Sequence, residues 1–177
     1  MVGKATVAYL SLGANLGDRK KNLDTALALL AGQMTVEKVS SVYDTEPVTE
    51  SPQPRFLNLA CRVRTDLSPE DLLSLAKSIE GRLGPHEHNQ PRPIDIDILL
   101  YDDLVMETSN LTIPHSRLAG RAFVLAPLAE IAPDVIHPVT RQTVRQMLGN
   151  LQDRYEVRKW EPARRSSDVR NNGGDPS

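Results

Sequence analysis

The sequence predicts an α+β protein in which an antiparallel sheet carries its helices on one face and leaves the other face for a site. Two observations lead to this class. Between residues 5 and 101, stretches with strand-like alternation and stretches with helical spacing follow in the order strand, helix, strand, strand, helix, strand. The chain has 177 residues, of which 40% are hydrophobic, which suits one domain. This order is that of a ferredoxin-like βαββαβ core, to which later residues add C-terminal elements.

The first strand and helix follow from alternation and spacing. Residues 5–12 (ATVAYLSL) predict a strand, and the glycines of residues 13–17 (GANLG) predict a turn after it. A helix should follow, and Gly32 is expected to end it in a left-handed cap. The helical spacing is carried by Leu23, Leu27 and Leu30.

A proline-rich loop separates the next two predicted strands. The first covers Val36 to Tyr43, and residues 44–54 contain three prolines, which remove backbone donors and predict a surface loop. Residues 56–65 then alternate, so that one face should be core. The expected core face holds Leu57, Leu59, Cys61 and Val63, and the other face holds Phe56, Asn58, Ala60, Arg62 and Arg64.

The second helix and the last core strand carry clear signals. Ser68 is the predicted N-cap, Pro69 suits the first turn, and Gly84 should end the helix. Residues 94–101 alternate as a strand. One face should hold Ile94, Ile96, Ile98 and Leu100, and the opposite face Asp95, Asp97, Leu99 and Tyr101.

Beyond the core, the sequence predicts short strands, helices near residues 122–130 and 144–151, and a strand at 155–160. We therefore expect a single domain over residues 1–160. Residues 161–177 have almost no aliphatic side chains, which predicts a disordered tail. A partner-binding peptide is the alternative interpretation of this tail.

The composition favours small-molecule ligands and a cytoplasmic location. Lysines and arginines total 21 against 23 acidic residues, so the chain has no positive field that would attract nucleic acid or an anionic membrane. The apolar stretch at the N-terminus (MVGKATVAYLSLGAN) is too short for a membrane-spanning helix, and no obligate protein partner is evident. The single cysteine, Cys61, lies in an apolar run, which indicates a buried thiol and a reducing compartment.

The strongest chemical signal is the pair Asp95 and Asp97 on one face of a strand. Two like charges about 7 Å apart repel unless they are neutralised, and Mg²⁺ is the natural partner of such oxygen ligands. An exposed strand face is the plainer interpretation of an isolated pair. However, Arg92, His115 and Arg121 lie nearby in the sequence and can contact phosphate oxygens, although each arginine taken singly is more simply a surface residue.

The remaining candidate ligand groups are histidines and phenylalanines. His86 and His88 lie one residue apart, which is a weak zinc pattern in a chain with no second cysteine. Phe56 and Phe123 are the only phenylalanines, and flat rings can sandwich a planar heterocycle. Core packing is the alternative, mainly for Phe123. No P-loop motif is present as a source of phosphate binding.

Several stretches together resemble a known family. They are AYLSLGANLGDR, SVYDTEPV, FLNLACRV, PRPIDIDILLYDD and LTIPHSRLAGRAFVLAPLAEIAP, with Lys159-Trp160 at the end. Over residues 6–160 the chain is similar to the 6-hydroxymethyl-7,8-dihydropterin pyrophosphokinases of folate biosynthesis. The resemblance implies transfer of pyrophosphate from ATP to the pterin hydroxymethyl group, with release of AMP.

The same resemblance implies roles for individual residues. Asp95 and Asp97 would hold two Mg²⁺ ions. The pterin pocket would comprise Thr45, Pro47, Val48, Phe56, Asn58 and Phe123. The ATP side would comprise Glu80, Arg92, Ile98, Thr112, His115, Ser116 and Arg121. Catalysis would depend on Asp95, Asp97, Arg92, His115 and Arg121.

One segment departs from the family pattern. Members usually carry a loop of the form Gly-Arg-x-Arg-x-x-Arg-Trp-Gly-Pro-Arg before the acidic strand, whereas residues 84–92 read GPHEHNQPR. His86 or His88 could partly replace the missing cations. Two other classes stay open: a different Mg²⁺-dependent phosphotransferase, and a noncatalytic pterin or nucleotide sensor with the same fold.

Overall fold

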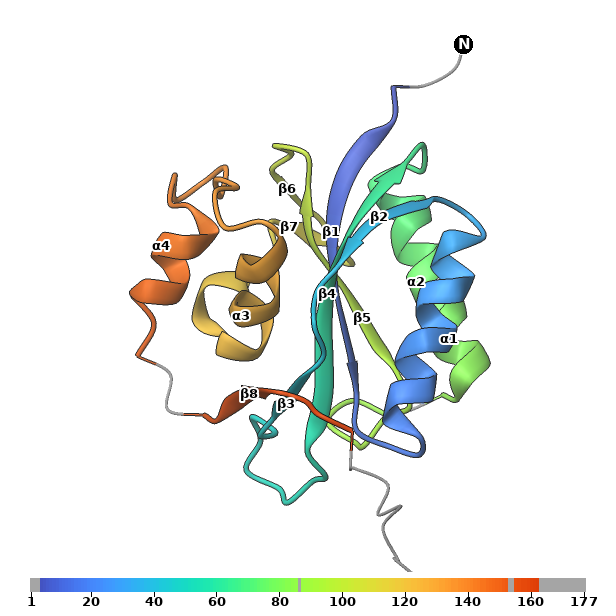
Figure 1. Ribbon diagram of the computed structural model, residues 1–177. Helices are drawn as coiled ribbons and strands as arrows, with labels where there is room; N and C mark the ends of the chain where they lie inside the picture. The colour runs from blue at the N-terminus through green and yellow to red at the C-terminus, as the bar shows by residue number, and fades with distance from the viewer. Residues whose placement is uncertain (1–3, 86, 153–154, 163–177) are drawn as a thin grey trace, which may run out of the picture.

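The computed structural model describes residues 4–85, 87–152 and 155–162, and its elements surround a central antiparallel sheet (Figure 1). Within these residues the strand order is β5-β1-β4-β3-β8, and β2 pairs with the second half of β4. The strands are β1 Thr6–Ala14, β2 Thr35–Val39, β3 Tyr43–Thr45, β4 Phe56–Thr65, β5 Asp95–Tyr101 and β8 Val157–Lys159, with a separate hairpin of β6 Met106–Glu107 and β7 Thr112–Ile113. The helices are α1 Arg19–Ala31, α2 Pro69–Leu83, the 3-10 helix Leu118–Gly120, α3 Ala122–Ile131 and α4 Val144–Gly149.

Helices lie on both faces of the sheet (Figure 1). α1 and α2 lie together on one face, over the core that they share with β1, β4 and β5. α3 and α4 lie on the other face, where they form a second cluster. The α+β class with a ferredoxin-like core is confirmed, and α3 and α4 are the C-terminal additions. Because these additions bury Ala60, which was expected on the polar face of β4, only the part of this face beside α3 is left for a site.

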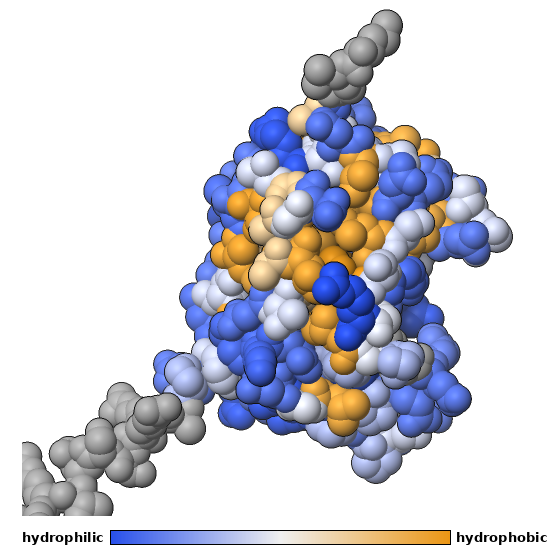
Figure 2. Space-filling model, turned by 90° about the vertical axis from the view of Figure 1, so that its right-hand side faces the viewer, coloured by the Kyte–Doolittle hydropathy of each residue, from blue (hydrophilic) through white to orange (hydrophobic). Residues whose placement is uncertain are grey.

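The face formed by α1 and α2 follows the predicted pattern. Figure 2 shows it with apolar residues gathered between charged and polar ones. Leu23 and Leu30 of α1 are fully buried, as is Leu72 of α2. The Ser68 side chain accepts a hydrogen bond from a backbone N–H of the first turn of α2, and the helix ends before Gly84, as predicted.

Three local predictions on the first half of the chain are wrong. β1 continues to Ala14, two residues past the predicted end. Gly32 has φ of −71°, so it ends α1 in a right-handed conformation rather than a left-handed one. The strand predicted at residues 36–43 is two strands, and β3 extends to Thr45 within the expected loop. Its pairing with β4 on one side and β8 on the other explains this extension, because both partners are distant in sequence.

A bulge in β5 reverses the predicted faces at the end of this strand. Ile98 pairs with Leu10, whereas Leu100 pairs with Tyr9, so Leu99 is an extra residue on β5. Leu99 and Leu100 both lie in the cluster under α3. The prediction that Leu100 shares a face with Ile98 is therefore wrong, while the acidic residues before the bulge keep their predicted face.

The predicted tail lies almost wholly outside the described residues. Residues 161 and 162 are described and follow β8, but residues 163–177 are not. A single domain over residues 1–160 and a disordered tail after it stay predictions.

Candidate active site

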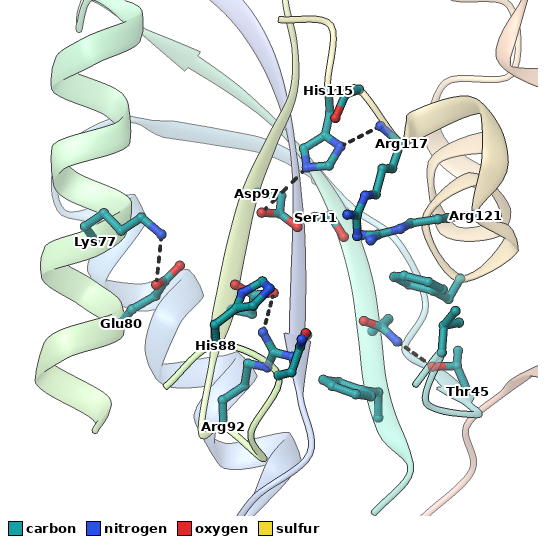
Figure 3. Close-up of a pocket in the computed structure, with 18 of the residues that line it drawn as sticks. Ser11, Thr45, Lys77, Glu80, His88, Arg92, Asp97, His115, Arg117 and Arg121 are labelled. Atoms are coloured by element: carbon teal, nitrogen blue, oxygen red, sulfur yellow. Dashed lines mark hydrogen bonds and ion pairs between the residues drawn. The ribbon is translucent and has the colours of Figure 1, made fainter. Parts of the chain in front are cut away.

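A cavity of about 740 Å³ opens on the second face of the sheet, between α2 and α3 (Figure 3). The strand register determines its floor. Gly13 of β1 pairs with Asn58 of β4 on one side and with Asp95 of β5 on the other, and Ser11 pairs with Asp97. The acidic pair and Asn58 therefore flank β1. The cavity is lined by Ser11, Gly13, Thr45, Glu46, Val48, Phe56, Asn58, Lys77, Glu80, Gly81, Pro85, His88, Asn89, Arg92, Asp95, Asp97, His115, Ser116, Arg117, Arg121 and Phe123.

The acidic pair shows the mutual repulsion expected of two carboxylates in a partly closed site. Burial and the negative charge of Asp95 raise the pKa of Asp97 to about 7, although Arg121 acts in the opposite direction. A bound cation would relieve this cost. Two carboxylates suit Mg²⁺, which keeps several waters and takes further ligands from phosphates. The donor set therefore fits this metal.

His115 is held with one ring nitrogen toward the acids. Its Nδ1 accepts a hydrogen bond from the backbone N–H of Arg117 at 3.1 Å, and its Nε2 lies 3.9 Å from Asp97 Oδ1. Burial lowers the pKa of His115, and the charges of Arg121 and Arg117 lower it further. A neutral ring that accepts at Nδ1 carries its proton on Nε2, so His115 presents a donor to the cavity.

Two arginines join the acidic side of the cavity to the aromatic side. The Arg92 guanidinium lies 3.5 Å from Asp95 Oδ2 and 5.6 Å from the centre of the Phe56 ring. The Arg121 guanidinium lies 5.3 Å from the centre of the Phe123 ring. Each arginine therefore lies against an aromatic ring, and Arg92 also reaches the acidic pair.

The other side of the cavity combines those two rings with a buried amide. Asn58 is 4% exposed, and its Nδ2 donates a hydrogen bond to Thr45 Oγ1 at 2.6 Å. A Cβ atom on Gly13 would lie 2.5 Å from Asn58 Oδ1, so glycine is required there for this amide to keep its place. Gly13, which we predicted as part of a turn, therefore belongs to the cavity floor.

Asn15 is a positioning residue that the sequence analysis missed. It is 1% exposed, and its side chain donates hydrogen bonds to Gln53 Oε1 and the Pro54 carbonyl while accepting one from the Arg92 backbone N–H. It therefore ties the end of β1 to the loop before β4 and to the loop before β5. An amide in an otherwise apolar stretch was the signal available in the sequence.

Most of the predicted site residues converge on the cavity, but three do not line it: Pro47, Ile98 and Thr112. The Ile98 side chain is 3% exposed and lies in the cluster under α1 and α2. A contact from Ile98 to ATP would therefore have to use the backbone of the edge strand β5. Thr112 pairs with Glu107 in the small hairpin.

Glu80 lines the cavity but already has partners. Its Oε1 accepts a hydrogen bond from the Ile96 backbone N–H at 3.0 Å, and its Oε2 lies 3.5 Å from Lys77 Nζ. This carboxylate fastens α2 to the outer edge of β5. Glu80 would therefore affect ATP binding partly by holding β5 in position.

Two cationic side chains that the sequence analysis did not single out also line the cavity. Lys77 lies one turn before Glu80 on α2, and Arg117 lies between His115 and Arg121. His88, proposed as a substitute for the missing arginines, also lines the cavity, whereas His86 lies outside the described residues. In the part of the chain that the structure describes, no cluster of three or more metal-ligating side chains is present.

The fold and the site together define a class of enzyme. An α+β domain whose cavity joins two carboxylates, two arginines and a histidine to a pair of aromatic rings is suited to phosphoryl chemistry on a flat heterocycle. The comparison with family models identifies the family. Residues 9–133 match the 7,8-dihydro-6-hydroxymethylpterin-pyrophosphokinase (HPPK) model, and the chain belongs to this family.

Sequence relatives agree with this assignment. The chain is 47% identical over 133 residues to the 2-amino-4-hydroxy-6-hydroxymethyldihydropteridine pyrophosphokinase of Bacillus subtilis, covering 73% of this chain and 80% of that protein. It is 43% identical over 152 residues to the folic acid synthesis protein fol1 of Schizosaccharomyces pombe, covering 84% of this chain. The match spans only 21% of the S. pombe protein and 26% of the related Dictyostelium discoideum protein. The family predicted from the sequence is confirmed.

Solved structures share the fold. The HPPK-DHPS protein of Plasmodium falciparum, crystallised with pteroate, superimposes with a TM-score of 0.71 at 20% identity, covering 82% of this chain and 42% of that one. At this identity the likeness supports the fold alone. None of the helices within the described residues combines the length and apolar character needed to cross a bilayer.

Proposed function

We propose that this chain transfers the pyrophosphoryl group of ATP to the hydroxymethyl oxygen of 6-hydroxymethyl-7,8-dihydropterin and releases AMP. Family membership supports the reaction. The placement of the substrates is supported by one structural observation, the row of Asn58, Gly13 and Asp95 across three paired strands. Because neighbouring strands lie about 4.8 Å apart, the amide and the acid are roughly 10 Å apart, which suits a pterin whose hydroxymethyl arm reaches a triphosphate.

We assign the heterocycle to the side of β4. Phe56 and Phe123 would stack on the flat ring, while Asn58, fixed by Thr45, would hydrogen-bond its polar edge. Val48, which is 48% exposed and lines the cavity, would close over the ring from the loop before β4. This assignment keeps the hydroxymethyl group on the side that faces β5.

We assign the triphosphate to the side of β5. Asp95 and Asp97 would hold two Mg²⁺ ions, which supply charge neutralisation on the phosphates when bound. Arg92, His115 and Arg121 donate hydrogen bonds to phosphate oxygens and offset the charge that develops on the transferred group. The pterin oxygen attacks the β-phosphorus, the bond from that phosphorus to the AMP oxygen breaks, and the hydroxyl proton leaves to solvent.

Product analysis tests this proposal. The protein is mixed with ATP, Mg²⁺ and 6-hydroxymethyl-7,8-dihydropterin, and the nucleotides are separated by chromatography. We expect AMP and pterin pyrophosphate from the wild type and from Asp103→Ala, an exposed acid just beyond β5, but not from Asp95→Ala/Asp97→Ala. ADP as the product would indicate a different phosphotransferase. Pterin binding without any nucleotide product would indicate a sensor.

A further inference from the structure

Ser11 is a buried polar side chain that the mechanism above does not use. It is 6% exposed and lines the cavity from β1, next to Asp97 of the paired strand (Figure 3). No described residue forms a hydrogen bond with its hydroxyl. Among the described residues, the side-chain atoms that are both sealed from solvent and unpaired belong to Arg55 and Arg92, so the Ser11 hydroxyl is accessible from the cavity.

The position of Ser11 lies between the two proposed substrate sides. Ser11 and Gly13 are the cavity residues of β1, and this strand separates Asn58 from the acidic pair. Cβ atoms of directly paired residues lie about 5 Å apart, which places Ser11 within one hydrogen bond of any group bound beside Asp97. The pterin hydroxymethyl oxygen must occupy this region to reach the phosphates.

We infer that Ser11 contacts the reacting group of the substrate, with Oγ accepting the hydrogen bond of the pterin hydroxymethyl O–H. This inference rests on the proposed function. A hydroxyl is suited to the position because it can accept a hydrogen bond without adding a third negative charge beside Asp95 and Asp97. It would turn the substrate oxygen toward the β-phosphorus and keep it there, which is a contribution to orientation.

Ser40 provides a matched control. It is 7% exposed, so it is as buried as Ser11, but its Oγ accepts a hydrogen bond from the Ala60 N–H at 2.9 Å and donates one to the Ser41 carbonyl at 2.7 Å. Ser40 does not line the cavity. Removal of its hydroxyl should lower stability, whereas removal of the Ser11 hydroxyl should not, because no intramolecular hydrogen bond is lost.

The test compares two ligands that differ in one hydroxyl group. The affinities of 6-hydroxymethyl-7,8-dihydropterin and 6-methyl-7,8-dihydropterin are measured by calorimetry with Mg²⁺ and a nonhydrolysable ATP analogue. For Ser11→Ala we expect about 5-fold weaker binding of the hydroxymethyl compound and unchanged binding of the methyl compound. We also expect a kcat about 10- to 100-fold lower, with an unchanged melting temperature. Ser40→Ala should lower the melting temperature and leave the affinities for both ligands unchanged.

Equal losses for both ligands, or no loss for either, would overturn the role of Ser11. The ratio of the two affinities requires no turnover, so it tests Ser11 even if the wild type forms no AMP. If no AMP forms but Ser11→Ala weakens binding of the hydroxymethyl compound alone, the proposed reaction fails while the Ser11 contact stands. A wild type that binds neither pterin overturns both.

Discussion

Replacement of Asp97 by asparagine should stabilise the metal-free protein while abolishing its activity. The variant keeps the shape of the side chain and removes one of two like charges. Two residues apart on one strand, the charges of Asp95 and Asp97 lie about 7 Å from each other. With an effective dielectric constant of about 20, their repulsion is roughly 2.4 kcal/mol. Because 35% of the Asp97 side chain is exposed, ionic screening applies and leaves about 1 kcal/mol.

The pH dependence follows from the raised pKa of Asp97. In the folded protein this pKa is about 7, above its ordinary value of 3.8, so the native state binds the proton more tightly than the unfolded state. The free energy of unfolding contributed by this group therefore falls as pH rises from 3.8 to about 7. At pH 5 only the lower part of this fall has taken place, so the advantage of the variant over the wild type should be smaller than at pH 8. At pH 8 the variant should be more stable by about 1 kcal/mol.

Urea unfolding in EDTA at the two pH values measures this difference. Asp103→Asn serves as the control for removing an exposed acid and should change stability little at either pH. Mg²⁺ with an ATP analogue should then stabilise the wild type more than Asp97→Asn. A variant that is less stable than the wild type at pH 8 without metal would refute the reasoning, because it would show that Arg121 and His115 more than compensate the repulsion.

Three further predictions concern the cavity floor, a helix end and the core. Gly13→Ala should weaken pterin binding at least about 10-fold, because the added Cβ displaces the Asn58 amide. Fluorescence titrations should show that nucleotide binding is retained. The control is Gly149→Ala, since a Cβ at Gly149 would lie in open space. Ser68→Ala should lower the free energy of unfolding by about 1 kcal/mol in urea titrations, with activity unchanged. Burial raises the pKa of the Cys61 thiol to about 12, so a thiol reagent at pH 8 should label it only after denaturation.

The chemistry of the site was predictable where one short segment carries it. The acidic pair keeps its predicted face because alternation within seven residues of β5 determines which side chains point together. The N-cap of α2 is equally local, since Ser68 bonds to the turn that follows it. Arg92, His115 and Arg121 were candidates for phosphate contact because they lie near the acidic pair in the sequence, and the family resemblance implied the same three residues. The structure brings all three to one cavity.

Long-range pairing decided what the sequence could not. The extra residue at Leu99 is defined only by the register between β5 and β1, and it moves Leu100 to the opposite face. β3 exists because β4 and β8, far away in the chain, supply its hydrogen-bond partners. Propensity does not encode such partners, which is why Thr45 was expected in a loop.

The sequence by itself determined the class of fold, the family and the acidic strand, because these depend on periodic patterns and on motifs read along the chain. The tertiary structure decided that α3 covers part of the face expected to be free, that Gly13 makes room for Asn58, and that Ser11 opens into the cavity. Each of these depends on which side chains meet across strands and between layers. Such contacts follow from strand register and from packing, which no local stretch of sequence contains.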